Sequence, residues 1–352
     1  PDVPVESLCQ HPIETLRQQK TFYNKRIPLP KDIYGPKRRN SRGVNLNIRS
    51  HYYPLMEKMA TFMDKQYPTK PLLAFDVADD STNTHSVTSP FDRRQTVGSV
   101  QWTSKEQAAK ALDAAWEAFP RWDTTPVAER AAIVRRLGDL MEEHMAELMT
   151  LCSREGGKLL TDGVDEIKEA VDFCRYYAMR AEESFGEPIE LPGPTGESNR
   201  LMMGGKGVFA AISPWNFPVA IFCGQIVAAA VAGNTVLAKP AEQTSIVANR
   251  VIELLYEAGM PRDVVQLLPG DGPTVGSVLT SDPRITGVVF TGGTDTAQII
   301  NRALAARDNA PLPTLIAETG GMNAMIVDST ALPEQVVVDV IQSAFQSAGQ
   351  RC

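Results

Sequence analysis

A regular alternation of short apolar segments and helical segments begins at about residue 206. The apolar segments are GVFAAIS, TVLAK, VVQLL and GVVFTG, and helical patterns follow them at about 220–232, 244–258, 273–280 and 294–306. This alternation is typical of a parallel sheet of the doubly wound kind. The sequence therefore predicts an α/β fold with a Rossmann-like parallel sheet. Such sheets bind ligands at the carboxyl ends of their strands.

The composition divides the chain into three predicted regions. Residues 1–85 are rich in Pro, Lys, Arg and Tyr and favour a connector, with one short helix near PLMEKMATFMDKQ. Residues 86–312 are expected to hold several helices and then the nucleotide-binding sheet. Residues 313–352 contain the apolar segments TLIAE and NAMIV, which favour the beginning of another α/β unit. The chain starts at Pro1 and stops within this unit, so we interpret it as a piece of a longer protein.

Helix signals are clearest between residues 104 and 184. Ser104 is expected to cap the first helix, and a second helix is expected from Pro126 to the glycine pair at 156–157. A third helix is predicted over about 163–184, and a last one over about 333–347.

The charge of the chain argues against nucleic acid as a main partner. Lys and Arg number 35 against 42 Asp and Glu, which gives a net charge of −7. The strip KRRNSR, Lys37–Arg42, is a local exception. It is compatible with a solvated linker or with a docking strip for a neighbouring domain.

Cysteine and histidine usage indicates neither a disulfide framework nor a metal site. The five cysteines are odd in number, widely spaced and without a CxxC pair, and the four histidines show no HxxH or HExxH pattern. A reducing, cytoplasmic setting is the simplest expectation. Cys152 and Cys174 fall at apolar positions of predicted helices, so we expect them to pack in the core.

One apolar run is shorter than a membrane span. Pro218–Gly233 is interrupted by Gln225 and falls short of the roughly 20 residues that cross a bilayer. The run predicts a buried helix.

Three motifs at predicted strand ends suit a dinucleotide. Gly292 and Gly293 lie between a strand and a helix start, where free N–H groups favour a pyrophosphate, although an ordinary strand–turn–helix has the same pattern. Lys239 and Glu242 follow another strand. A carboxylate there binds a ribose diol and repels a 2′-phosphate, which favours NAD over NADP, but a surface ion pair is the alternative. GDGPTVG, 270–276, is one residue too long for the dinucleotide fingerprint, and a tight turn explains it equally well.

Three further residues are candidates for catalysis. Asn216, in ISPWNFP, has an amide that can stabilise an oxyanion. Glu318 ends an apolar strand, where partial desolvation would raise its pKa and suit a general base. Cys352 follows SAGQR and is compatible with inert packing, a disulfide or a nucleophile. As a nucleophile it needs Arg351 or a helix dipole to lower a thiol pKa of roughly 8.5.

Taken together, these motifs resemble a known family. PWNFP, KPAE, FTGG, ETGG and GQRC occur in this order, which is similar to the aldehyde dehydrogenase superfamily over about residues 86–352. Within it, IPLPKDIYGPKRRNSRGVNL, NAMIVDSTALPEQVV and SAFQSAGQRC resemble the 1-pyrroline-5-carboxylate (glutamate-semialdehyde) dehydrogenase part of bifunctional proline utilization A proteins.

The resemblance implies a role for each matching residue. Cys352 would attack the aldehyde and carry a thiohemiacetal and then a thioester, with Asn216 and the Cys352 N–H holding the oxyanion. Glu318 would activate water, and Phe217 would pack on the substrate. One departure is Gly293, where the family often has Ser, so a hydroxyl contact is lost. The implied cofactor contacts are Ile212, Ser213, Pro214, Trp215, Lys239, Glu242, Gly272, Gly292, Gly293, Thr319 and Gly320.

The implied activity is NAD-dependent oxidation of L-glutamate 5-semialdehyde to L-glutamate, the second step of proline catabolism. The implied partner is a proline dehydrogenase domain with FAD in the same polypeptide, within a cytoplasmic homo-oligomer. The resemblance is also compatible with a parent protein that is peripheral at the inner membrane. The 352-residue piece alone is expected to be inactive. The alternatives are another aldehyde substrate, such as succinate semialdehyde, and a non-catalytic interaction or DNA-binding role.

Overall fold

The computed structural model describes residues 4–18, 24, 26–308 and 310–351. The chain forms two compact units, Pro1–Asn40 and Ser41–Cys352. Among its described residues, the first unit holds four short helical segments and no buried side chain, and Arg38 lies over the Tyr34 ring at 3.6 Å. Its segments are α1 (Val5–Leu8), α2 (Pro12–Gln18), η1 (Pro30–Asp32) and η2 (Gly35–Lys37).

The second unit is built on a five-stranded, fully parallel sheet in the order β10-β9-β6-β7-β8. From the central strand β6, the chain adds β7 and β8 on one side and then returns to add β9 and β10 on the other. The doubly wound fold predicted from the alternation is therefore confirmed. The strand order reverses between β6 and β9, where such sheets bind ligands. The strands are β6 (Val208–Ile212), β7 (Thr235–Lys239), β8 (Val265–Leu267), β9 (Ile285–Gly292) and β10 (Thr314–Thr319).

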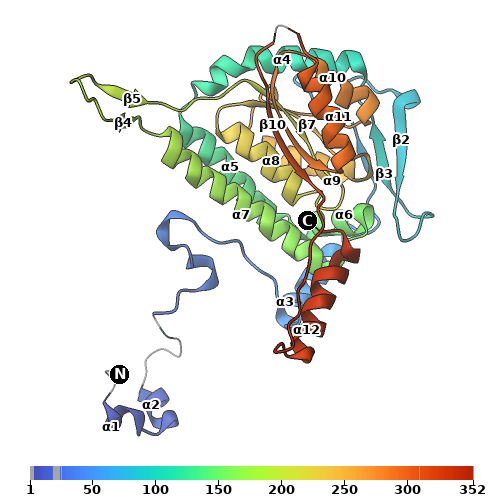
Figure 1. Cartoon of the computed structure of the whole chain (residues 1–352). Coiled ribbons are helices and arrows are strands. Elements are labelled where there is room, and N and C mark those ends of the chain that lie inside the picture. The colour runs from blue at the N-terminus through green and yellow to red at the C-terminus, as the bar shows by residue number, and fades with distance from the viewer. Residues whose placement is uncertain (1–3, 19–23, 25, 309, 352) are drawn as a thin grey trace. The chain divides into compact units, whose positions relative to one another are not determined.

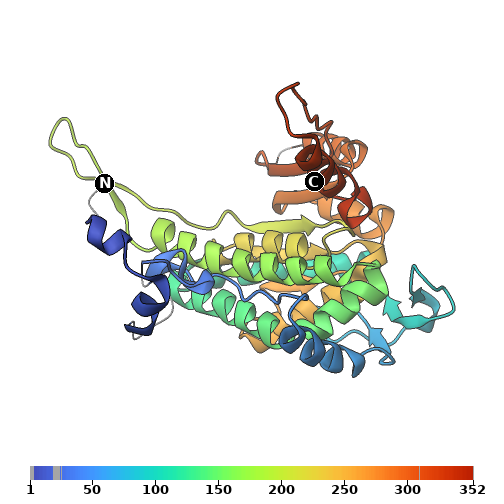
Figure 2. The same ribbon diagram turned by 90° about the horizontal axis from the view of Figure 1, so that it is seen from below.

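Helices cover both faces of this sheet (Figures 1 and 2). Alternate residues of β6 enter different cores. Phe209 and Ala211 belong to the core that includes side chains of α5 (Val127–Glu143), α7 (Leu160–Phe185), α8 and α9, and Val208 and Ala210 belong to the core that includes side chains of α4 (Lys105–Asp123), α10 and α11. Burial on both faces explains why β6 and the middle of β7 are continuous apolar runs. The helices after the strands are α8 (Ala220–Val231), α9 (Ser245–Glu257), η5 (Gly272–Gly276), α10 (Ser277–Ser281) and α11 (Thr294–Ala305).

Four consecutive helices occupy residues 105–185, before the five-stranded sheet, and Ser104 begins the first of them as predicted. Its hydroxyl accepts from Gln107 N, and the Gln107 side chain accepts from Ser104 N, which completes a capping box. The single helix predicted after Pro126 is wrong, because the backbone leaves the helical region at His144 (φ −97°, ψ 16°). α5 buries one stripe, whereas α6 is buried around most of its circumference, and one straight amphipathic helix cannot do both. The helices are α4 (Lys105–Asp123), α5 (Val127–Glu143), α6 (Met145–Gly156) and α7 (Leu160–Phe185).

The segment before residue 86 contributes more structure than a connector. The predicted helix is present as α3 (Arg49–Ala60), but the small sheet β1-β3-β2 was not predicted. Its strands are short and partly polar, so they lack a clear period. The domain boundaries at 85/86 and 312/313 stay predictions. The remaining strands are β1 (Tyr67–Thr69), β2 (Thr84–Thr88) and β3 (Thr96–Gln101), followed by the hairpin β4 (Ile189–Leu191) and β5 (Asn199–Leu201), which extends away from the body of this unit (Figure 1).

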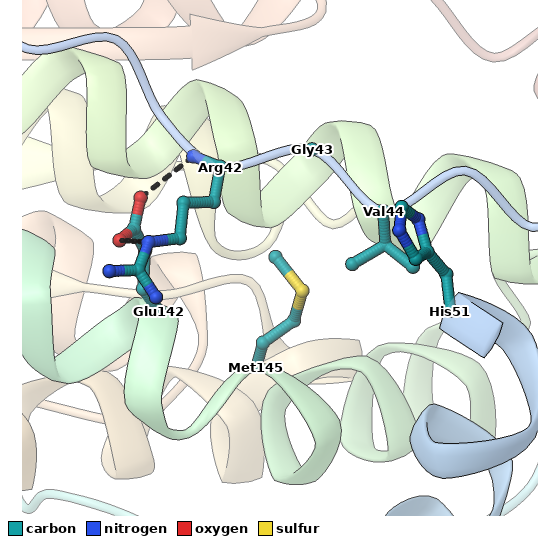
Figure 3. A pocket seen from close by; sticks show the side chains of 6 residues that line it. All are labelled: Arg42, Gly43, Val44, His51, Glu142 and Met145. Atoms are coloured by element: carbon teal, nitrogen blue, oxygen red, sulfur yellow. Dashed lines mark hydrogen bonds and ion pairs between the residues drawn. The ribbon is translucent and has the colours of Figure 1, made fainter. Parts of the chain in front are cut away.

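Ser41 and Arg42, which end the basic strip, form hydrogen bonds with helices of the second unit. Ser41 donates from N and Oγ to the Asp172 carboxylate at 2.8 and 2.6 Å, and Arg42 N donates to Glu142 Oε1 at 2.8 Å. Figure 3 shows Arg42 and Glu142 at one end of a cavity of about 270 Å³, with Met145 and His51 along it. These contacts hold Ser41 and Arg42 against α5 and α7.

The chain after β10 is largely exposed. The strand predicted for NAMIV is wrong, because residues 323–327 pair with no strand in the described ranges. The last predicted helix is shorter than expected and ends in a tight turn in which Ser347 and Ala348 have φ of 54° and 55°. These segments are α12 (Pro333–Val340), η6 (Ile341–Phe345) and η7 (Gln346–Gly349).

The apolar run at 218–233 forms α8, a buried core helix as predicted. In the part of the chain that the structure describes, no helix is both long and apolar enough for a membrane span.

Candidate active site

Most of the predicted cofactor residues lie at the carboxyl ends of the parallel strands. Ile212, the last residue of β6, lies beside Lys239 of β7 and Phe290 of β9. Gly292, the last residue of β9, lies beside Thr319 of β10. Residues that are more than 100 positions apart in the sequence therefore lie at this one edge, formed by the carboxyl ends of the strands, next to the position where the strand order reverses.

Lys239 and Glu242 form the polar part of this edge. Lys239 Nζ lies 3.0 Å from Glu242 Oε1, and its side chain is only 6% exposed. Lys239 O also accepts from Ser213 N at 3.2 Å, which ties the end of β7 to the end of β6. Glu242 remains one-third exposed, so its carboxylate is accessible to a hydroxyl donor.

The start of α11 leaves space for a ligand. Gly293 precedes the helix, no side chain caps it, and a Cβ at this position would meet no atom within 4 Å. The first N–H groups of this 12-residue helix have no side-chain cap, which suits a phosphate.

A buried polar atom lies close by. Gln225 Nε2 donates to Thr291 Oγ1 at 3.0 Å, while Gln225 Oε1 is buried and has no partner in the described residues. A carboxylate, an uncapped helix start and an unsatisfied acceptor at one edge fit a dinucleotide such as NAD.

Gly272 has a different setting from the one that the motif suggests. It begins η5, where Asp271 Oδ1 accepts from Thr274 N at 2.7 Å. GDGPTVG is therefore a capped helical turn rather than the glycine-rich loop of the dinucleotide fingerprint, although a Cβ at Gly272 would also meet open space.

Asn216 meets the C-terminal segment. Its Nδ2 donates to Gln350 O at 3.0 Å, which joins the loop after β6 to residues just before Cys352. A cavity of about 210 Å³ lies at this contact, and Trp215, 42% exposed, borders it. The lining residues are Gly156, Gly157, Lys158, Leu159, Asp162, Trp215, Asn216, Ser347, Ala348 and Gln350.

Two residues beside Asn216 were not predicted from the sequence. Lys158 Nζ donates to Asn216 O at 2.7 Å and to Glu166 Oε2 at 2.5 Å, and it lies 4.1 Å from the centre of the Phe217 ring. The available signals were a Lys directly after a helix-ending glycine pair and a Glu on the apolar face of the next helix.

Glu318 lies at the same carboxyl-end edge of the sheet, but the prediction that its carboxyl is partly desolvated is wrong. The residue is exposed, because β10 is an edge strand that pairs only with β9 among the described residues. Gly320 follows it and is also exposed.

Cys352 lies outside the described residues, so its predicted role stays a prediction. Three other cysteines, Cys152, Cys174 and Cys223, are buried, which confirms the core packing predicted for the first two. Burial raises the pKa of the Cys152 thiol well above its usual range. The hydrogen bond with Cys174, at an Sγ–Sγ distance of 3.6 Å, and burial do the same for Cys223. Neither thiol suits a nucleophile. In the described ranges, no cluster of three His, Cys, Asp or Glu residues is arranged to hold a metal ion.

Comparison with known sequences identifies the family. The sequence model of the aldehyde dehydrogenase family matches residues 77–352, and the chain belongs to this family.

The similar proteins point to one branch of the family. The chain is 44% identical to the "Bifunctional protein PutA" of Salmonella typhimurium over 99% of this chain and 26% of that protein. A structure of a Bradyrhizobium japonicum proline utilization A mutant is 46% identical over 99% of this chain and 32% of that one, with a TM-score of 0.84. A Thermus 1-pyrroline-5-carboxylate dehydrogenase with bound NAD is 32% identical over 89% of this chain and 61% of that one, also with a TM-score of 0.84. The chain thus spans about a quarter of the length of the curated PutA relatives that it matches.

Proposed function

We propose that this chain provides the aldehyde-oxidising site of a 1-pyrroline-5-carboxylate dehydrogenase, which converts L-glutamate 5-semialdehyde to L-glutamate with NAD. The names of the relatives support the substrate. The main support for the proposal is the hydrogen bond from Asn216 to Gln350 O. Because of this bond, the proposed oxyanion donor and the residues next to Cys352 line the same cavity.

In this proposal Cys352 attacks the aldehyde carbon, and the Asn216 amide stabilises the charge that develops on oxygen. The aldehyde carbon is then oxidised to the level of a thioester on Cys352. Glu318 removes a proton from water, which attacks the thioester and releases the acid. Glu318 is exposed in the described chain, so its carboxylate is accessible to water. Phe217 would pack on the aliphatic part of the substrate.

NAD, when bound, accepts the two electrons and the hydrogen that the aldehyde loses. Lys239 and Glu242 would hold the adenosine ribose, and the carboxylate of Glu242 would disfavour a 2′-phosphate. Gly292, Gly293 and the start of α11 would hold the pyrophosphate. Ile212, Ser213, Pro214, Trp215, Gly272, Thr319 and Gly320 complete the proposed contacts.

The wider context is also part of the proposal. By its similarity to the longer relatives, the chain would work within a bifunctional polypeptide that carries an FAD-dependent proline dehydrogenase. The enzyme would be a cytoplasmic homo-oligomer without nucleic-acid binding through this region.

NADH formation by the intact polypeptide tests the proposal. We expect turnover with 1-pyrroline-5-carboxylate to exceed turnover with succinate semialdehyde, and Cys352→Ala to abolish it. Cys9→Ala, which removes an exposed cysteine of the first unit, is the matched control and should keep full activity. Activity that survives Cys352→Ala would refute the assigned nucleophile, and a preference for succinate semialdehyde would refute the substrate.

A further inference from the structure

We propose that Lys158 and Glu166 form a positioning pair that sets the orientation of Asn216 for the oxidation step. The proposal rests on the proposed function, since it needs Asn216 to act as the oxyanion donor. Neither residue follows from the motifs in the sequence, and both are defined by their contacts in the structure.

The first step is the ion pair itself. Lys158 Nζ and Glu166 Oε2 lie 2.5 Å apart, and the two side chains are 6% and 0% exposed. A buried pair of this kind gives little net stability compared with apolar side chains, yet losing one partner leaves an uncompensated charge. Such a pair is therefore weak evidence for a purely stabilising role. The groups that the pair contacts indicate its role instead.

Glu166 holds the segment after Asn216 through hydrogen bonds. Its second oxygen, Oε1, accepts from Val219 N and Ala220 N at 2.8 Å each. These are N–H groups at the start of α8, which have no partner inside the helix. The carboxylate therefore fixes where α8 begins and the direction in which the chain enters it.

Lys158 forms a hydrogen bond with Asn216 itself. Its ammonium donates to Asn216 O at 2.7 Å and lies 4.1 Å from the centre of the Phe217 ring. A fixed carbonyl fixes the orientation of the peptide plane and limits the directions that the Asn216 side chain can take. One ammonium–carboxylate pair thus holds both ends of residues 216–220, while the Asn216 amide points toward Gln350.

Both members of the pair stand on rigid supports. Lys158 follows Gly157, which ends α6 with φ of +68°, and the N–H groups of both residues donate back to α6 carbonyls. A Cβ at Gly157 would also approach Pro90 Cγ to 3.0 Å. Glu166 lies on the buried face of α7. The pair is therefore placed by two helices and not by the loop that it orients.

The test compares three variants of the intact polypeptide. Lys158→Met removes the donor to Asn216 O, and Glu166→Gln keeps an acceptor for α8 but removes the charge partner. The double variant leaves no unpaired charge, but it still lacks the donor to Asn216 O. We expect Lys158→Met to lower kcat for NADH formation by about 100-fold, as small misplacements of a catalytic group do, with KM for NAD within about twofold.

The double variant separates positioning from stabilisation. We expect it to regain most of the thermal stability that either single variant loses, while its kcat stays about 100-fold low. If kcat recovers together with stability, the pair only supports the fold and the inference is wrong. If a single variant fails to fold, the double variant alone decides the question by the same criterion.

Two controls complete the design. Glu155→Gln changes a buried carboxylate that caps α9 through Ile246 N and Val247 N, at 2.8 Å each, and does not contact the Asn216 loop. It should keep wild-type kcat. Asn216→Ala tests the function itself. Wild-type kcat in this variant would overturn the proposed role of Asn216 and the inference with it. A low kcat in Asn216→Ala, with wild-type kcat in Lys158→Met, would overturn the inference alone.

Discussion

The pH dependence of stability should carry a contribution from Glu155. This carboxyl is buried between α6 and α9, and burial raises its pKa from an ordinary value of about 4.5 to about 8, although two backbone N–H groups of α9 oppose the rise. A carboxyl with a raised folded-state pKa binds its proton more tightly in the folded chain. Its burial therefore costs little below pH 4.5, and the cost grows as the pH rises toward 8.

The magnitude follows from the two pKa values. At 1.36 kcal/mol for each unit of pKa, a difference of about 3.5 gives a total of about 5 kcal/mol, most of it between pH 5 and pH 8. Glu155→Gln cannot ionise. The free energy of unfolding of wild type relative to this variant should therefore fall by about 3–4 kcal/mol between pH 5 and pH 8.

Urea unfolding of both proteins at four pH values in this range, followed by tryptophan fluorescence, provides the measurement. Every other titrating group is common to the two proteins and cancels in the difference. A difference that stays constant within about 1 kcal/mol would refute the reasoning. It would mean that the two N–H bonds and the N-terminal end of α9 compensate the burial and keep Glu155 ionised.

Three further predictions concern the site and the sheet. Asn216→Ala should lower kcat about 100- to 1000-fold in steady-state NADH assays, because one oxyanion donor is lost, and a smaller change would argue against that role. Glu242→Gln should lower the preference for NAD over NADP at least about tenfold in kcat/KM, since the charge that repels a 2′-phosphate is removed, and an unchanged preference would contradict the ribose assignment. Gly287→Ala should destabilise the domain by about 1–3 kcal/mol in thermal unfolding, because a Cβ there would overlap the Phe209 ring. Wild-type stability would show that the Phe209 ring moves aside without cost.

Local signals were sufficient to predict much of the fold. The strands β6, β7 and β9 each contain a short apolar run, α8 follows from one apolar segment, and Ser104 with Gln107 defines a helix start. In each case the residues that decide the structure are neighbours in the chain. The carboxyl ends of parallel strands share one edge, so the sequence also indicated where the cofactor candidates gather.

Features that depend on distant contacts were not predicted. The break at His144 depends on what surrounds α6, and the NAMIV segment lacks a partner strand in the described chain. Glu318 was expected to be partly buried because its strand is apolar, but an edge position leaves it exposed. The contacts of Lys158 with Asn216 and Glu166 join three separate elements, and no local pattern encodes such a meeting.

The order of the strands also has a consequence for biosynthesis. Val208 of β6 pairs with Ile285 of β9, and the roughly 75 residues between them take on the order of 4–15 s to translate at about 5–20 residues per second. During that interval β6 and β7 can pair, but the other edge of β6, a row of unpaired backbone groups beside apolar side chains, stays open. The nascent chain therefore passes through a period in which its central strand is exposed to aggregation, and a chaperone bound near β6 would protect it until β9 emerges from the ribosome.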